Sequence, residues 1–129
     1  MADNEEMTVV VADDSASLRA TTREILEAEG HRVLKAANGA VALQVMHNED
    51  VDVLVLDLHM PVCDGFEVLS RLEDPQPLVI VVSGFEGESL ADIEAEFGPK
   101  VYGFLCKPAS PVAIIEVVNA ALEASRRTL

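Results

Sequence analysis

The sequence predicts a single α/β domain built around a doubly wound parallel sheet. Its 129 residues suit one domain, and half of them are hydrophobic, which is enough for an ordinary core. Short segments rich in valine and leucine alternate with segments of helical periodicity, the pattern typical of successive βα units. We expect five such units, with strands at residues 8–13, 32–36, 51–57, 78–83 and 101–106.

Helix-capping signals agree with this alternation. Ser15 is suited to cap the first helix, which ends near Gly30. Ser110 is suited to cap the last one, where Pro111 takes the first helical position. The other helices are expected from Asn38 onward, over residues 66–72 and over residues 88–97.

The chain divides into a short tail and one domain. Residues 1–7 are mostly acidic and polar, so we expect a flexible tail there. Residues 8–125 form the expected domain, and residues 126–129 its C-terminal end. The sequence leaves open whether the chain acts alone or was cut from a longer regulator before an effector region.

Composition excludes several classes of function. The formal charge of −14 repels phosphate backbones and argues against direct nucleic acid binding. No apolar run approaches the ~20 residues that cross a bilayer, so we expect no membrane insertion. Two cysteines, Cys63 and Cys106, are too few for a disulfide framework. These features favour the cytoplasm.

Polar side chains follow four of the five predicted strands. Asp13 and Asp14 end the first strand, Asp57 the third and Ser83 the fourth, and the fifth leads into Lys107. Because ligands of open parallel sheets bind beyond the carboxyl ends of the strands, we expect these side chains to form one site.

The expected site has the composition of a magnesium-dependent phosphoryl-transfer centre. Three carboxylates repel one another unless a cation lies among them, and oxygen ligands suit Mg²⁺. A carboxylate can attack phosphorus to form an acyl phosphate, a role that suits Asp57. Lys107 would neutralise the phosphoryl oxygens, and the Ser83 hydroxyl would donate a hydrogen bond to one of them.

Four segments, VVADDS, LDLHMPVCDGFE, VVSG and FLCKP, resemble the receiver domain of bacterial two-component response regulators across nearly the whole chain. The resemblance implies a flavodoxin-like (βα)5 fold with strand order 2-1-3-4-5 and Asp57 as the phosphoacceptor. It also implies Mg²⁺, or Mn²⁺ in its place, bound by Asp13, Asp14, Asp57 and the backbone carbonyl of His59. Compared with the family, the stretch from Asp57 to Ser83 is short and that from Ser83 to Lys107 is long.

The resemblance further implies a switch and two kinds of partner. Ser83 and Phe104 would act as switch residues that alter the surface of helix four, strand five and helix five. A histidine kinase or histidine phosphotransfer protein would dock near helix one, and a protein target or an effector domain would use the switched surface. A second phosphorylated copy of the chain would be a further partner. The lysine would precede a cis peptide bond, and the rim of the pocket would comprise Met60, Pro61, Gly84, Phe85 and Pro108.

Three alternatives fit the same residues less well. A phosphohydrolase with an aspartyl nucleophile would need a second acid where His59 stands. A flavin electron carrier would need a phosphate-binding loop where Asp13 and Asp14 stand, and their charges would repel phosphate. A degenerate receiver that serves as a scaffold would not need the intact set of site residues. We therefore expect a regulatory phosphoacceptor that assists its own phosphorylation and hydrolysis, and not an enzyme.

Overall fold

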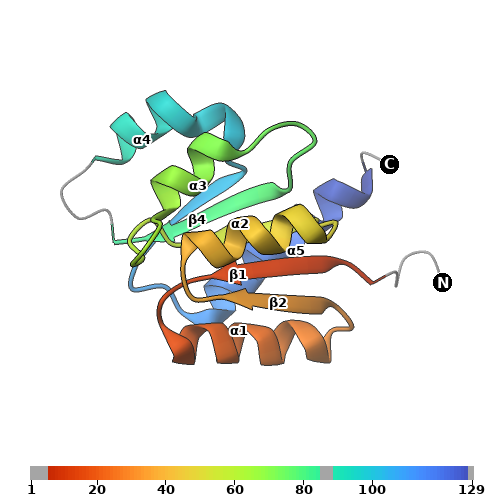
Figure 1. Cartoon of the computed structure of the whole chain (residues 1–129). Coiled ribbons are helices and arrows are strands. Elements are labelled where there is room, and N and C mark those ends of the chain that lie inside the picture. Colours follow the sequence, from red (N-terminus) through yellow and green to blue (C-terminus); the bar gives the residue numbers. More distant parts are fainter. Residues whose placement is uncertain (1–5, 85–88, 128–129) are drawn as a thin grey trace.

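The computed structural model describes residues 6–84 and 89–127. A five-stranded parallel sheet runs through the centre of the molecule in the order β2-β1-β3-β4-β5 (Figure 1). This confirms the fold class and the strand order. The strands are β1 Thr8–Ala12, β2 Arg32–Ala36, β3 Val53–Leu56, β4 Leu78–Ser83 and β5 Gly103–Cys106.

Helices cover both faces of the sheet and create two apolar layers. Helices α1 and α5 pack on one face around Leu26 and Ile114. Helices α2, α3 and α4 pack on the other, around Ala42, Val68 and Ile93. The helices are α1 Ala16–Ala28, α2 Gly39–Asn48, α3 Gly65–Arg71, α4 Leu90–Phe97 and α5 Pro111–Arg127, with a 3-10 turn, η2, at Gly98–Lys100.

The valine-rich strands supply both layers because successive side chains point to opposite faces. In β1, Val9 and Val11 face the α1/α5 layer, whereas Val10 and Ala12 face the other. All four are buried, as expected for a strand that lies between two parallel neighbours. The continuous apolar runs of the sequence therefore arise from burial on both faces.

Strands β1 and β3 each end one residue earlier than predicted, and β3 and β5 begin two residues later, whereas the other ends are as predicted. The hydrogen-bonded ladder of β1 and β3 continues for one more residue. The Asp13 N–H donates to the Ala36 carbonyl at 3.1 Å, and the Asp57 N–H donates to the Ala12 carbonyl at 2.9 Å. Both aspartates thus follow β1 and β3 directly. Their side chains lie where the sheet ends and the loops begin.

Helix α3 is short, and a distant lysine stabilises its end. It spans 7 residues, and the Lys100 ammonium donates to the Leu69 and Leu72 carbonyls at 3.0 and 3.1 Å. A cation there interacts favourably with the carbonyls at the end of the helix, of which that of Leu69 also accepts from the Leu72 N–H at 3.3 Å. Lys100 ends η2, which follows α4 directly and contributes to the length of the chain between Ser83 and Lys107.

Strand β1 begins, and helix α5 ends, on the side opposite the carboxyl ends of the strands (Figure 1). Of the residues assigned to the tail, Met7 is buried, and its carbonyl accepts a hydrogen bond from the Arg32 N–H at 2.9 Å. Residues 1–5 of the predicted tail lie outside the described part.

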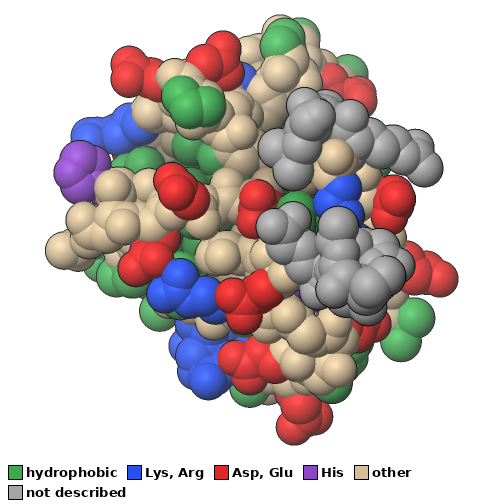
Figure 2. Space-filling view, turned by 90° about the vertical axis from the view of Figure 1, so that its right-hand side faces the viewer, with side chains coloured by type: hydrophobic (Ala, Val, Ile, Leu, Met, Phe, Trp, Pro, Cys, Tyr) green, Lys and Arg blue, Asp and Glu red, His purple; other side chains and the backbone are tan. Residues whose placement is uncertain are grey.

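On the side of the molecule opposite the carboxyl ends of the strands, acidic side chains are scattered between separate hydrophobic patches (Figure 2). No described helix is long and apolar enough to cross a membrane.

Candidate functional site

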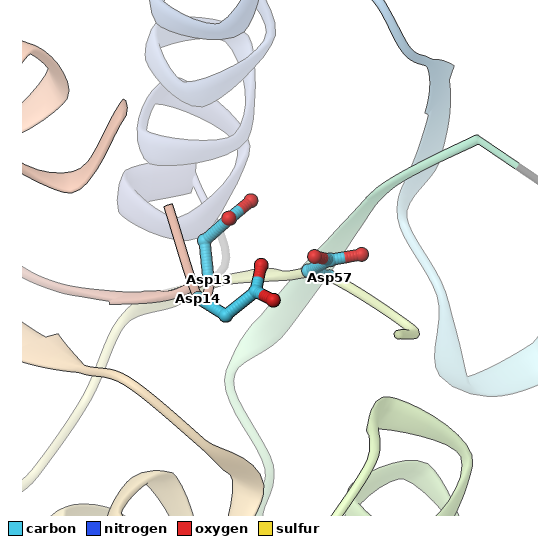
Figure 3. Close-up of side chains that lie close together, drawn as sticks. All are labelled: Asp13, Asp14 and Asp57. Atoms are coloured by element: carbon cyan, nitrogen blue, oxygen red, sulfur yellow. The ribbon is translucent and has the colours of Figure 1, made fainter. Parts of the chain in front are cut away.

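Three aspartates gather at the carboxyl end of the sheet. Asp13 and Asp14 follow β1 and Asp57 follows β3, its direct neighbour in the sheet (Figure 3). One carboxylate oxygen of each lies within 4.8 Å of the others. Asp13 and Asp57 are 2% and 4% exposed, whereas Asp14 is exposed. The predicted cluster therefore has two buried carboxylates and one that faces solvent.

Lys107 connects the two buried carboxylates. Its ammonium lies 3.0 Å from Asp13 Oδ2 and 3.2 Å from Asp57 Oδ2. The position of Lys107 after β5 is set by the sheet, because its N–H donates to the Ser83 carbonyl at 2.8 Å. A single positive charge is thus shared between two buried negative charges.

Backbone N–H groups hold the other oxygen of each buried carboxylate. The Ser15 N–H donates to Asp13 Oδ1 at 2.8 Å, and the His59 N–H donates to Asp57 Oδ1 at 3.1 Å. Each of these side chains is therefore fixed at both oxygens. Such preorganisation removes the cost of orienting the group when a reaction begins.

The single ammonium of Lys107 does not balance all of the negative charge of the carboxylates in the site. Burial raises the pKa of the Asp57 carboxyl above its ordinary value, and the negative charge of Asp13 adds to this, while the His59 N–H and Lys107 oppose it. Burial lowers the pKa of the Lys107 ammonium, but hydrogen bonding and charge from Asp13 and Asp57 outweigh it and raise that pKa. A further cation would relieve the remaining repulsion.

Two glycines allow the loop after Asp57 to pack closely. A Cβ on Gly65 would lie 2.4 Å from the Asp57 carbonyl oxygen, and its N–H donates to the Leu58 carbonyl at 3.0 Å. A Cβ on Gly39 would lie 2.4 Å from the Cys63 carbonyl oxygen, to which the Gly39 N–H donates at 2.8 Å. No local sequence signal marks Gly39, because this contact joins α2 to a loop that is distant in the sequence.

The two predicted switch residues lie on neighbouring strands. Ser83 is fully buried at the end of β4. Phe104 is half-buried on β5, pairs with Val81 and packs against the core layer under α2, α3 and α4.

The predicted rim residues are more dispersed. Met60 is buried within the core layer, whereas Pro61, Gly84 and Pro108 are exposed, and Phe85 lies outside the described residues. His59 is exposed, and its ring lies edge-to-face against that of Phe66, with the two ring centroids 6.1 Å apart. The Lys107–Pro108 peptide bond is cis, as the resemblance implied.

The donor set fits a hard divalent cation. The three aspartates offer only oxygen ligands, which Mg²⁺ and Mn²⁺ prefer to sulfur. Lys107 contacts Asp13 and Asp57, whereas Asp14 lies on the exposed side of the cluster. An ion could therefore reach the cluster from the exposed side.

Comparison with known proteins agrees with this geometry. Residues 9–119 match the model of the response regulator receiver domain. The chain belongs to this family. The receiver domain of a CheY-like protein from Methanospirillum hungatei superposes with a TM-score of 0.85 at 24% identity, covering 97% of this chain and all of that one. A Francisella receiver domain gives 0.80 at 27% identity, covering 95% of this chain and 99% of the other.

The curated relatives of this receiver domain are longer proteins. Transcriptional regulatory protein GlrR of Escherichia coli is 31% identical over 91% of this chain, which spans 26% of that protein. A protein-glutamate methylesterase/protein-glutamine glutaminase of Hahella chejuensis is 40% identical over 61% of this chain, which spans 24% of its length. ResD of Bacillus subtilis is 29% identical over 95% of this chain, and the chain spans 51% of it.

Substituting Gly65 tests the close packing behind Asp57. Gly65→Ala should lower the free energy of unfolding by about 1–3 kcal/mol, because its Cβ would collide with backbone atoms that cannot rotate away. Gly98→Ala is the matched control, since a Cβ there would meet nothing within 4 Å. Urea unfolding measures both, and equal effects of the two substitutions would contradict the packing argument.

Substituting Asp57 tests the electrostatics of the site. A raised pKa means that the folded protein binds the proton more tightly than the unfolded chain, so the charged carboxylate costs stability at neutral pH. Asp57→Asn should raise the free energy of unfolding in metal-free buffer at about pH 7, on the order of 1 kcal/mol. The gain should shrink as the pH falls through the raised pKa. A gain that grows toward acid pH would show that Asp57 is not destabilised by its charge.

Proposed function

We propose that this receiver domain is a phosphorylation-dependent signalling switch. In this proposal Asp57 accepts a phosphoryl group from a phosphohistidine of a kinase or of a phosphotransfer protein. The observation that carries it is the position of Asp57, which is buried with one oxygen held by the His59 N–H and the other by Lys107. A purely structural carboxylate would not need two acidic neighbours at its side.

The transfer exchanges one bond to phosphorus for another. A carboxylate oxygen of Asp57 forms the new bond as the bond to the donor nitrogen breaks, and that electron pair leaves with the imidazole. Both oxygens of Asp57 are held by neighbouring groups, so little reorientation of the side chain would precede attack. The domain thereby assists its own phosphorylation, and its output is an altered surface and not a released product.

Four groups of this chain would hold Mg²⁺, or Mn²⁺ in its place. They are the carboxylates of Asp13, Asp14 and Asp57 and the backbone carbonyl of His59. When bound, the ion supplies positive charge that balances the phosphoryl oxygens. The proximity of the three carboxylates supports this assignment.

Lys107 and Ser83 would respond to the new phosphoryl group. Lys107 already lies 3.2 Å from Asp57 and would pair with a phosphoryl oxygen. The Ser83 hydroxyl would donate a hydrogen bond to another. As Ser83 shifts, Phe104 on the neighbouring strand would turn inward, and exposed Gly84 would leave room at the rim of the pocket.

The proposed output surface combines α4, β5 and α5. Leu90, Tyr102 and Val112 leave 43%, 44% and 65% of their area exposed there or at its border, enough to supply apolar contacts. A protein target, an effector domain or a second phosphorylated copy would bind this surface. The phosphodonor would dock beside α1, which begins next to the acidic site. We propose that this exchange takes place in the cytoplasm. We propose no direct contact with nucleic acid.

Intact-mass measurement tests the proposal. After incubation with Mg²⁺ and a small-molecule phosphodonor, the wild type should gain one phosphoryl group that is labile to base. Asp57→Asn should gain none, because the nucleophile is absent. Asp50→Asn removes an exposed carboxylate elsewhere and should be labelled like the wild type.

Two outcomes would contradict the proposal. Labelling of Asp57→Asn would place the phosphoryl group on another residue. A folded wild type that is labelled neither by small phosphodonors nor by histidine donors would favour a scaffold that never carries phosphate.

A further inference from the structure

Arg19 reaches from the first turn of α1 to the acidic site. It is half-buried, and its guanidinium donates a hydrogen bond to the backbone carbonyl of Asp13. The helix fixes its origin, because the Arg19 N–H donates to the Ser15 carbonyl at 3.1 Å. No local sequence signal marks Arg19, since nothing in a spacing of six residues identifies such a contact.

The carbonyl that Arg19 holds belongs to the peptide unit between Asp13 and Asp14. Asp13 is also fixed at its N–H by Ala36, and at its two carboxylate oxygens by Ser15 and Lys107. The Asp14 side chain makes no hydrogen bond or ion pair within residues 6–84 and 89–127. The direction of the Asp14 side chain therefore depends on the backbone that carries it. The orientation of the Asp13–Asp14 peptide thus sets where the Asp14 carboxylate lies.

We propose that Arg19 is a positioning residue that holds this peptide so that Asp14 faces the cation shared with Asp13 and Asp57. The inference rests on the proposed function, because it assigns Arg19 to the metal site of that function. Groups that orient metal ligands typically change metal affinity by about 10- to 100-fold when they are removed.

The sign of the effect separates positioning from simple charge. A guanidinium close to a cation site repels the cation, so removing Arg19 should tighten Mg²⁺ binding if charge alone mattered. Loss of positioning should weaken it. Arg23 provides the matched control, because it lies one turn further along α1 and pairs with Glu27 at 3.0 Å instead of with the site.

The experiment measures the Mg²⁺ dissociation constants of the wild type, Arg19→Gln, Arg19→Lys and Arg23→Gln. An NMR titration that follows backbone amides of the loop after β1 reports binding without any phosphoryl transfer. We expect Arg19→Gln to bind Mg²⁺ about tenfold more weakly than the wild type. Arg19→Lys should fall between them, because lysine keeps the charge and offers a single compact donor. Arg23→Gln should bind as tightly as the wild type or slightly more tightly.

The inference would be overturned if Arg19→Gln bound Mg²⁺ as tightly as the wild type or more tightly. That result would leave the proposed function intact. If that variant does not fold, as judged by urea unfolding in EDTA, Arg19→Lys decides by the same criterion. A wild type that binds no Mg²⁺ at all would overturn the metal site of the proposed function and this inference together.

Discussion

The repulsion among three carboxylates at the end of one sheet is the constraint on which the rest of the site depends. Two of them are buried, and Lys107 contacts both, so a single ammonium balances part of the charge. Because β1 and β3 are parallel neighbours, Asp13 and Asp57 lie side by side at their ends. Asp14 lies close to them because it is the next residue in the chain. The fold therefore creates a charge imbalance at a fixed place, and a cation or a phosphoryl group with its cation can relieve it.

The surrounding backbone maintains that imbalance by leaving the carboxylates little freedom to separate. N–H groups of Ser15 and His59 each hold one oxygen, and Gly65 brings the start of α3 against the Asp57 backbone. The two donors are main-chain groups, and the Gly65 contact joins main-chain atoms, so the restraints on the carboxylates originate in the backbone. Lys107, which follows an edge strand, reaches both buried carboxylates through its long side chain.

Sequence alone was sufficient for the features that local pattern encodes. The alternation of apolar and helical segments predicted five βα units, and the polar residues after the strands predicted the cluster of Asp13, Asp14 and Asp57. The strand order came from resemblance, because periodicity does not say which strands pair. The contacts of Gly39 and Lys100 join segments far apart in the chain and depend on the packed structure, so no local signal predicted them.

If the carboxylate cluster is built for a divalent cation, Mg²⁺ binding must stabilise the folded protein, and unfolding measurements can detect this linkage. Above the dissociation constant, the free energy of unfolding of the wild type should rise by about 1.4 kcal/mol for each tenfold increase in Mg²⁺, measured against NaCl of equal ionic strength. Asp14→Asn should show a much smaller rise over the same range, because it loses the carboxylate that faces solvent. An identical rise in Asp14→Asn, or no rise beyond that caused by NaCl in the wild type, would contradict the account.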